Sequence, residues 1–200
     1  LLSAQLWLFG WAPLNGRGMP VALGYFLLPL ILVIVGRFLY GDRMTWWQWA
    51  AAGLAAVGVG FEVVRVGSIG WETVLVALGY TVYFVLRRGL GINHLGGMWW
   101  EIAVAAPVAA VLLGLEIGAG SAFSENPALW WSAPAFGLFA ALALLLYLLA
   151  SKLLPLSLFG LLSYVEPALL VVAALLIGER IAAAELPAYL AIWAAVAVLL

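Results

Sequence analysis

The sequence contains no cysteine and only one histidine, His94. Disulfide bonds are therefore excluded, and a thiolate or clustered-imidazole metal site would lack its ligands. We predict neither a metal site nor a bound cofactor. Charged residues are also scarce, at 8% of the chain, against about 25% in an average soluble domain. A net charge of −1 also excludes the basic surface that nucleic-acid binding requires.

Apolar residues are abundant instead. They make up 68% of the sequence, which includes 11 tryptophans and has a mean hydropathy of +1.19. So few charges cannot cover a globule of this size, and the composition predicts that the lipid bilayer is the solvent. The chain opens inside a hydrophobic run, "LLSAQLWLFGWA", with neither Met nor a basic signal region. We therefore expect it to start partway through a membrane helix.

The charges, glycines and prolines divide the chain into one partial and about seven full membrane spans. A helix needs about 20 apolar residues to cross about 30 Å of hydrocarbon. The partial span ends at residue 12, and full spans are predicted at 20–40, 46–66, 71–88, 96–117, 129–150, 156–177 and 184–200. The connections are too short for a soluble domain. The sequence thus predicts an all-α, polytopic membrane helical bundle.

Small residues recur at four-residue spacing inside these spans. The repeats are Ala52, Ala56 and Gly60, then Gly114 with Gly118, Ala184 with Ala188, and Ala191 with Ala195. This spacing is typical of helices that pack closely in lipid. An alanine-rich composition also produces such spacing by chance.

The basic residues favour one orientation in the membrane. The residues predicted on one side are Arg37, Arg43, Arg87, Arg88 and Lys152, and those on the other are Arg17, Arg65 and Arg180. Because cytoplasmic loops carry the excess of Lys and Arg, the loops with the five basic residues are predicted to be cytoplasmic. The acidic loop "GAGSAFSENP" then faces outward.

A pattern appears twice, with a nearly constant offset. The pairs are Arg17 and Pro20 with Lys152 and Pro155 (135 positions), Pro29 with Pro167 (138), and "GDRM" at 41–44 with "GERI" at 178–181 (137). The offset covers five spans. A unit with an odd number of spans inserts upside down relative to its copy.

We therefore predict an inverted five-plus-five repeat. Residues 1–66 form the C-terminal part of the first unit and residues 71–200 the second. Inverted repeats are typical of transporters that work by alternating access. The alternative is a gene duplication in a membrane protein that transports nothing.

Several segments carry a family resemblance: "LWLFGWAPLNGRG", "LGYFLLPL", "GRFLYGDRM", "WETVLVALGYTVYFVLRR", "HLGGMWWE" and "LPLSLFGLLSYVEPALLVVAALLIGER". Together they resemble the RarD-type members of the EamA group in the drug/metabolite transporter superfamily. The resemblance implies a ten-helix bacterial inner-membrane protein with two EamA repeats and cytoplasmic termini. It also implies that the opening helices of the first repeat are absent here. The family's name associates it with chloramphenicol, without a defined physiological substrate.

The candidate site centres on a carboxylate beside a proline. Glu166 lies ten residues into its predicted span, about 15 Å deep, and Pro167 follows it. Pro29 occupies a similar depth in the other half. Each proline deprives the carbonyl four residues earlier of its helical donor, at Ser163 and at Tyr25. Freed carbonyls at this depth must meet protein, water or ligand, so we predict a polar cavity where the repeats meet.

A lone carboxylate at this depth has several possible roles. Glu166 can bind a cation, pair with a basic group of the substrate, or take up a proton as coupling ion. The structural alternative is a neutral side chain that hydrogen-bonds a loosened helix and never meets substrate.

Other residues are weaker candidates for substrate binding. They are Tyr164, Glu101 at the inner mouth, Tyr83 with Tyr80 and Arg87 on one helix face, and Trp7 and Gln5 in the partial span. The face with Tyr80, Tyr83 and Arg87 can instead be an interfacial belt with a snorkelling arginine, which we favour. Glu62 and Arg65 are predicted to form a structural pair. The charges in 41–43 and in 178–180 are predicted to pair with each other within each helix exit.

The predicted function is a secondary transporter that exports small organic metabolites or drugs. A lipid or carrier translocase on the same scaffold is the first alternative. A membrane-embedded enzyme is the second, but the sequence has neither G-x-S-x-G nor H-E-x-x-H, and one histidine cannot assemble such a site. The sequence also lacks the P-loop that ATP-driven pumping would need in this chain.

Overall fold

The computed structural model describes residues 2–92, 94–119, 122–167, 169, 172 and 186–199, and these residues form helices and connecting turns without a strand. Contacts divide the chain into two compact units. Unit 1 comprises Leu1–Val85 and Leu154–Leu200, and unit 2 comprises Leu86–Leu153. The helices of unit 1 are α1 (Leu2–Leu14), α2 (Gly18–Leu39), α3 (Trp46–Val66), α4 (Trp71–Gly89, which continues into unit 2), α8 (Leu156–Leu162) and α10 (Leu186–Leu199). Those of unit 2 are α5 (Leu95–Ala119), α6 (Ala122–Glu125) and α7 (Leu129–Leu153).

Helix α3 illustrates how local sequence sets the boundaries. Thr45 accepts a hydrogen bond from the Gln48 amide, while the Gln48 side chain accepts one from the Thr45 amide. This capping box satisfies two amides at the start of the helix that would otherwise lack partners. The helix ends at Gly67, whose φ of 71° is the left-handed conformation that glycine adopts without steric cost.

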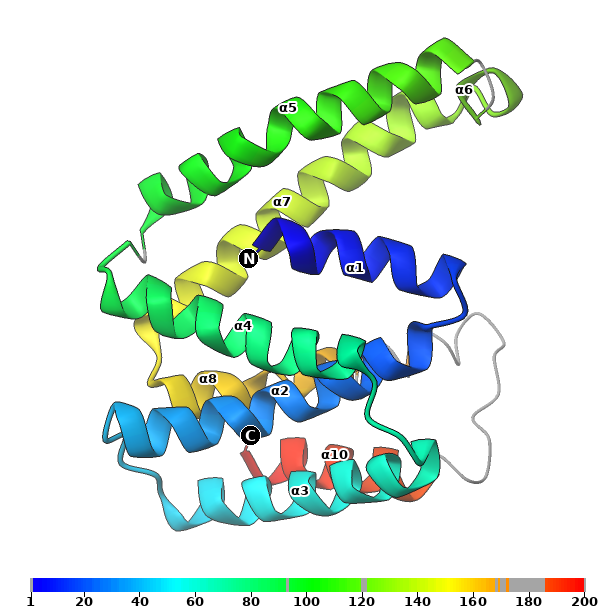
Figure 1. Ribbon diagram of the computed structural model, residues 1–200. Helices are drawn as coiled ribbons and strands as arrows, with labels where there is room; N and C mark the ends of the chain where they lie inside the picture. Colours follow the sequence, from blue (N-terminus) through cyan, green and yellow to red (C-terminus); the bar gives the residue numbers. More distant parts are fainter. Residues whose placement is uncertain are drawn as a thin grey trace. The chain divides into compact units, whose positions relative to one another are not determined.

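Two helix pairs dominate unit 1, namely α3 with α10 and α2 with α8, and both run side by side in Figure 1. Small residues permit the close approach. A Cβ added to Gly58 would lie 2.9 Å from the Ala188 carbonyl oxygen, and one added to Gly160 would lie 2.8 Å from that of Pro29. The buried seam of α3 runs through Ala51, Ala55 and Val59.

The predicted seam of α3 was therefore one residue out of register. Ala52 is buried, but Ala56 and Gly60 are exposed. An alanine-rich helix offers several seams of similar composition, and the partner helix α10 selects among them.

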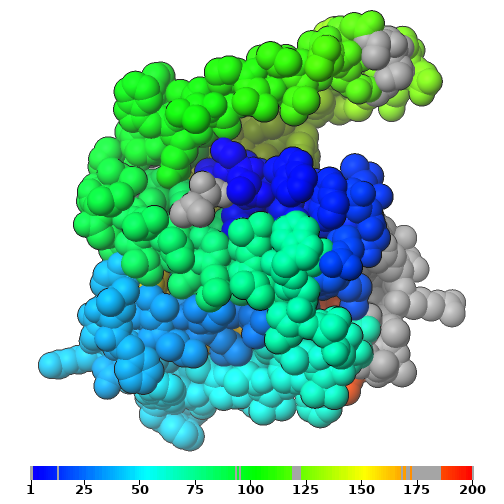
Figure 2. Space-filling model, viewed as in Figure 1, coloured from blue at the N-terminus to red at the C-terminus, as the bar shows by residue number. Residues whose placement is uncertain are grey.

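Helices α1, α2 and α4 pack around a second apolar cluster of Leu8, Ala12, Val21 and Val76. Gly24 lets α2 approach α4, because a Cβ there would lie 2.6 Å from the Val76 Cβ. Figure 2 shows the residues of α1 directly against those of α4. The Thr73 hydroxyl adds a hydrogen bond of 2.7 Å to the Pro20 carbonyl.

Ion pairs and a long-range cap complete unit 1. Arg17 pairs with Glu72, which is fully buried. Arg65 donates to both oxygens of Glu62, which confirms that predicted pair. Further contacts join the helix exit at 41–43 to the start of α8.

The predicted self-pairing of charges at this exit was wrong. The Asp42 carboxylate instead accepts hydrogen bonds of 2.9 Å from both the amide and the hydroxyl of Ser157. The N-terminal turn of α8 has unpaired amides that attract a carboxylate. The matching exit at 178–180 lies outside the described residues.

Four of the described helices are long and apolar enough to cross a membrane: α2, α3, most of α5 (Gly96–Gly118) and α7. The predicted spans at 71–88, 156–177 and 184–200 are not among them. Helix α4 carries three charged residues, and α10 has 14 described residues. Helix α8 ends at Leu162, which places an interruption inside the predicted span 156–177, next to the carbonyl that Pro167 was predicted to free.

Candidate functional site

The segment with Glu166 is a broken helix. After α8 ends, Ser163 and Tyr164 form a turn, and helical backbone resumes at residue 165. Pro167 has no amide with which to reach the Ser163 carbonyl. That carbonyl accepts a hydrogen bond of 3.2 Å from the Glu166 amide instead. The break follows from the proline, and it places Glu166 beside irregular backbone.

Tyr164 ties this break to α2. Its side chain is fully buried, and its hydroxyl donates a hydrogen bond of 2.8 Å to the Phe26 carbonyl. Phe26 lies three residues before the buried Pro29, whose carbonyl is close to Gly160. The two proline-containing segments are therefore in direct contact, and Tyr164 fills the space between them.

Glu166 itself is exposed. Its side chain forms neither a hydrogen bond nor an ion pair within the described part of the chain. It lies near enough to Tyr80 to act electrostatically on that hydroxyl. The Tyr80 hydroxyl is 3.5 Å from that of Tyr25, and the two ring centroids are 5.8 Å apart. The two phenol hydroxyls of α2 and α4 thus lie together, and the Glu166 carboxylate of the broken helix lies within electrostatic range of Tyr80.

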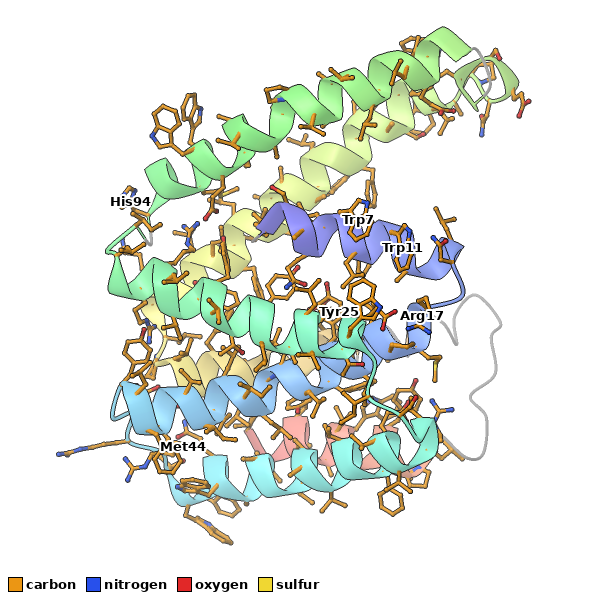
Figure 3. All side chains as sticks on the ribbon, viewed as in Figure 1. Trp7, Trp11, Arg17, Tyr25, Met44 and His94 are labelled. Atoms are coloured by element: carbon orange, nitrogen blue, oxygen red, sulfur yellow. The ribbon has the colours of Figure 1, made fainter. Side chains whose placement is uncertain are left out.

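Helix α1 adds aromatic rings to this side of unit 1. Trp7 is exposed and stacks on Trp11 at 5.4 Å between ring centroids. Phe9 meets the Tyr25 ring edge-on at 6.1 Å. Figure 3 shows Trp7, Trp11 and Tyr25 on neighbouring turns of α1 and α2. These rings form an apolar wall beside the hydroxyl pair.

Gln5 is placed differently from Trp7. It is 1% exposed, and its side-chain amide donates a hydrogen bond of 2.7 Å to the Leu75 carbonyl. The side-chain carbonyl has no hydrogen-bond partner among the described residues. Gly79 makes room for this side chain, because a Cβ there would overlap it. Gln5 thus joins α1 to α4 and keeps one acceptor available.

Two predicted site residues have other neighbours. Tyr83 is buried and meets Phe84 edge-on at 5.3 Å. Glu101 belongs to unit 2, where its carboxylate is 2.6 Å from the Arg87 guanidinium. Arg87 is only 2% exposed, so the favoured interpretation of this face as a belt with a snorkelling arginine was wrong.

The cluster has a defined chemical capacity. Glu166 can hold a cation or a proton, the Tyr25 and Tyr80 hydroxyls can donate or accept hydrogen bonds, and the tryptophans can stack on a flat apolar group. Across the described residues, no group of three or more His, Asp or Glu side chains could hold a metal ion.

Known proteins with similar sequences indicate the family to which this chain belongs. The "Chloramphenicol-sensitive protein RarD" of Pseudomonas aeruginosa is 43% identical over 197 residues, which are 98% of this chain and 66% of the relative. An uncharacterized transporter of Haemophilus influenzae is 35% identical over 190 residues, or 95% of this chain and 63% of the relative. A second Pseudomonas aeruginosa protein, an uncharacterized transporter, is 34% identical over 203 residues, or 99% of this chain and 68% of the relative. This chain belongs to the RarD-type transporter family.

The RarD-type relatives are longer than this chain, which spans slightly less than two thirds of the first two. Their names describe transporters, in agreement with the prediction of a transporter rather than an enzyme. No family model and no solved structure matches the chain. The apolar helices and the RarD-type relatives together identify a multi-pass membrane protein.

Some features of this RarD-type chain were not predicted from the sequence. The Tyr25–Tyr80 pair joins residues 55 positions apart, and Arg17 lies as far from its partner Glu72. Tyr80 was identified only as part of a helix face. Tyr80 lies nine residues into α4, at a depth similar to that of Tyr25 in α2. This similarity was the one feature of the sequence from which the pair could have been predicted.

Proposed function

We propose that the full-length protein is a secondary transporter of the bacterial inner membrane. It exports small organic compounds by alternating access between two inverted repeats. Glu166, Tyr25 and Tyr80 line its central site, with Trp7 and Gln5 beside them. Pro29, Pro167 and Tyr164 shape the backbone around it.

The contact between Tyr164 and Phe26 carries this proposal. These residues are 138 positions apart, which is the offset that relates Pro29 to Pro167. They are thus equivalent positions of the predicted repeats. Two copies of a unit related by a two-fold axis bring equivalent residues together only at that axis. The contact supports an axis that passes between α2 and the broken helix.

A second pair of helices agrees with this axis. Helices α3 and α10 are equivalent under the same offset, and they pack on each other. Ala55 and Ile192, which are 137 positions apart, belong to one buried cluster together with Tyr164. The axis therefore runs close to Glu166, where transporters with inverted repeats place their substrate.

Glu166 has the properties of a coupling or substrate-binding group. It is the only acidic residue of the described part of unit 1 outside the pairs Glu62–Arg65 and Glu72–Arg17 and the Asp42 cap. A carboxylate at membrane depth is costly unless a proton, cation or partner neutralises it. Proton binding by Glu166 would couple transport to the proton gradient.

The test is transport by the full-length protein with Glu166→Gln. Chloramphenicol, the compound in the name of the Pseudomonas aeruginosa relative, serves as the first probe, and metabolite profiling of cells with and without the gene extends the search. We expect Glu166→Gln to reduce export by about tenfold or more and to flatten its dependence on pH between about 5 and 8.

The matched control is Glu125→Gln, because Glu125 is exposed at the end of α6. It should keep the export rate and pH profile of the wild type. Equal pH profiles for Glu166→Gln and the wild type would remove Glu166 from the mechanism. Export of no compound in either assay, with lipid movement across the bilayer instead, would favour the translocase alternative.

A further inference from the structure

The two proline-containing segments of unit 1 have different backbones, although they occupy equivalent positions of the predicted repeats. Helix α2 is continuous over Gly18–Leu39 with Pro29 inside it. In the segment with Pro167, 138 positions later, α8 ends at Leu162 and helical backbone resumes only at residue 165. Equivalent prolines thus lie in a continuous helix in one repeat and beside a break in the other.

Local hydrogen bonds account for the break. The Ser163 hydroxyl donates a hydrogen bond of 2.9 Å to the Phe159 carbonyl, four residues earlier, and bonds of this kind bend helices. The amides of Tyr164 and Glu166 each donate to a carbonyl three residues earlier, at 3.2 Å, as in the tighter 3₁₀ turn. The residue equivalent to Ser163 is Tyr25, whose hydroxyl is at the far end of an aromatic ring and cannot bond its own helix in this way.

One long-range hydrogen bond favours the broken form. The Tyr164 hydroxyl donates to the Phe26 carbonyl at 2.8 Å, which ties the break to α2. Phe26 is itself the residue equivalent to Tyr164, and phenylalanine has no hydroxyl with which to form the reverse bond. The difference between the two segments therefore depends on a few hydrogen bonds, each of modest net strength. Two arrangements that differ by so little can both be populated.

The proposed two-fold axis defines what the second arrangement is. A transporter with inverted repeats reaches its opposite-facing state when the repeats exchange conformations. In the exchanged arrangement, α2 would be broken at Tyr25 and Phe26, because Pro29 has no amide with which to reach the Tyr25 carbonyl. The segment that begins at residue 156 would then be continuous.

We propose that the helix break moves from one repeat to the other during transport. It lies at Ser163 and Tyr164 in this structure, and at Tyr25 and Phe26 in the opposite-facing state. Glu166 directly follows the break, so its side chain changes direction when the break closes. This inference rests on the inverted repeat of the proposed function and identifies the backbone positions that change between its two states.

Hydrogen–deuterium exchange of the full-length protein in detergent, without solute, tests the proposal. Pro167→Ala supplies an amide that can reach the Ser163 carbonyl, which favours a continuous helix from residue 156. We expect slower exchange at residues 163–167 and about fivefold faster exchange at residues 25–28, the effect of one net hydrogen bond on a two-state equilibrium. Pro29→Ala strengthens α2 instead and should slow exchange at residues 25–28 about fivefold.

A second variant tests the same equilibrium without adding a backbone donor. Tyr164→Phe makes the two residues at the axis alike and removes the hydrogen bond to the Phe26 carbonyl. Exchange at residues 25–28 should again become about fivefold faster. This variant decides the question if Pro167→Ala fails to fold.

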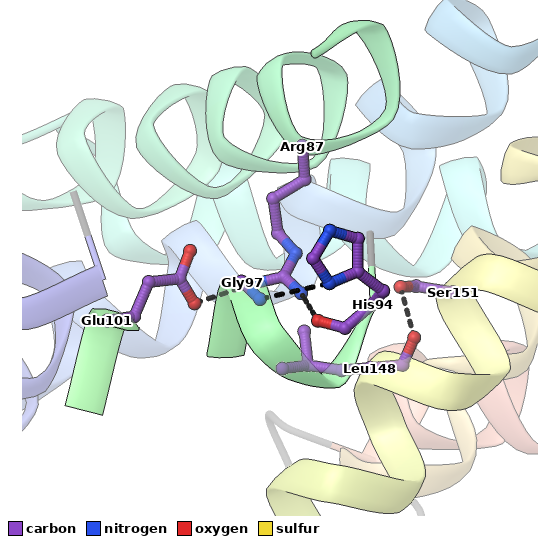
Figure 4. Close-up of polar contacts among 6 residues, drawn as sticks. All are labelled: Arg87, His94, Gly97, Glu101, Leu148 and Ser151. Atoms are coloured by element: carbon purple, nitrogen blue, oxygen red, sulfur yellow. Dashed lines mark hydrogen bonds and ion pairs between the residues drawn. The ribbon is translucent and has the colours of Figure 1, made fainter. Parts of the chain in front are cut away.

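Pro107→Ala is the matched control, because Pro107 lies inside a helix of unit 2, α5. Figure 4 shows the hydrogen bonds of Gly97 and Glu101 that hold the first turns of this helix. The control should leave exchange at residues 25–28 unchanged, and an equal increase there would overturn the proposal as general loosening.

Unchanged or slower exchange at residues 25–28 in the folded Pro167→Ala variant would also overturn the proposal, since the break would then be a fixed feature of the second repeat. Export assays on the same variants test the proposed function separately. Export by the wild type without the opposite changes in exchange would overturn this inference alone. The opposite changes in exchange without export of any compound would support the moving break and contradict the exporter.

Discussion

Helices α2 and α7 have nearly the same hydropathy but very different surroundings. In unit 1, 44% of the apolar window of α2 is buried against other helices, whereas in unit 2 only 6% of that of α7 is buried. Hydropathy therefore measures whether a helix can enter lipid, but not whether it has a helical partner there. Because lipid is as apolar as leucine, burial in unit 1 must come from close fit.

The glycines of the two units show where that fit arises. A Cβ added to Gly24, Gly58 or Gly160 in unit 1 would lie within 3 Å of a neighbouring helix. In unit 2, a Cβ at Gly114 or Gly118 would meet nothing within 4 Å. The predicted packing at Gly114 and Gly118 is therefore absent from the described structure. Four-residue spacing permits close approach but does not create it.

The largest change in stability is expected in unit 2. Little apolar surface is buried there, so an ion pair contributes a larger share of the stability. Glu101→Gln removes the charge beside Arg87, which is 2% exposed. An uncompensated buried charge is costly, so the free energy of unfolding should fall by about 3 kcal/mol. Denaturation of the purified protein in mixed detergent micelles would measure the change.

Glu125→Gln, which removes an exposed carboxylate from the same unit, should change the unfolding free energy by less than about 0.5 kcal/mol. Equal effects of the two substitutions would mean that Arg87 is solvated or neutralised by another group. The Arg87–Glu101 ion pair would then not make the stability of unit 2 depend on polar contacts more than that of unit 1 does.

A pair of glycine substitutions tests the packing contrast directly. Gly160→Ala forces a Cβ to within 2.8 Å of both the Leu32 Cβ and the Pro29 carbonyl oxygen. Overpacking of this kind should destabilise the protein by about 1 to 3 kcal/mol. Gly114→Ala should be neutral or stabilising by up to about 1 kcal/mol, since alanine is the better helix former. Equal destabilisation by both would contradict the difference in packing, and thermal denaturation in detergent measures both.

The sequence predicted local features well and long-range contacts poorly. The apolar runs placed α2 and α3 within two residues of their observed bounds of Gly18–Leu39 and Trp46–Val66. Span length and flanking charges are local properties. The turn at Ser163 and Tyr164 was not predicted, although Pro167 is its cause, because a proline can also be accommodated in a continuous helix, as Pro29 is in α2.

The candidate site shows the same limit. Glu166, Tyr25 and Pro29 were identified from depth and from the repeat, both of which can be counted along the chain. The neighbours that define their surroundings come from α4 and from turns far away in the sequence, such as Tyr80 beside Tyr25. Such pairs depend on helix rotation and register, which a one-residue shift of the buried seam changes entirely.

The smallest change in stability is expected at the Asp42 cap, which links the turn between α2 and α3 to the start of α8. Asp42→Ala removes the acceptor for the Ser157 amide and hydroxyl, which lie 115 positions away. Loss of a helix cap costs about 1 kcal/mol, and Asp42→Asn should cost less because its amide oxygen still accepts one hydrogen bond. In unit 2, the Asn126 side chain accepts a local hydrogen bond from the Ala128 amide, so Asn126→Ala should cost about 0.5 kcal/mol or less. Thermal denaturation of the three variants would rank their stabilities. If Asp42→Asn proved as unstable as Asp42→Ala, the negative charge, rather than the acceptor atom, would be what stabilises the start of α8.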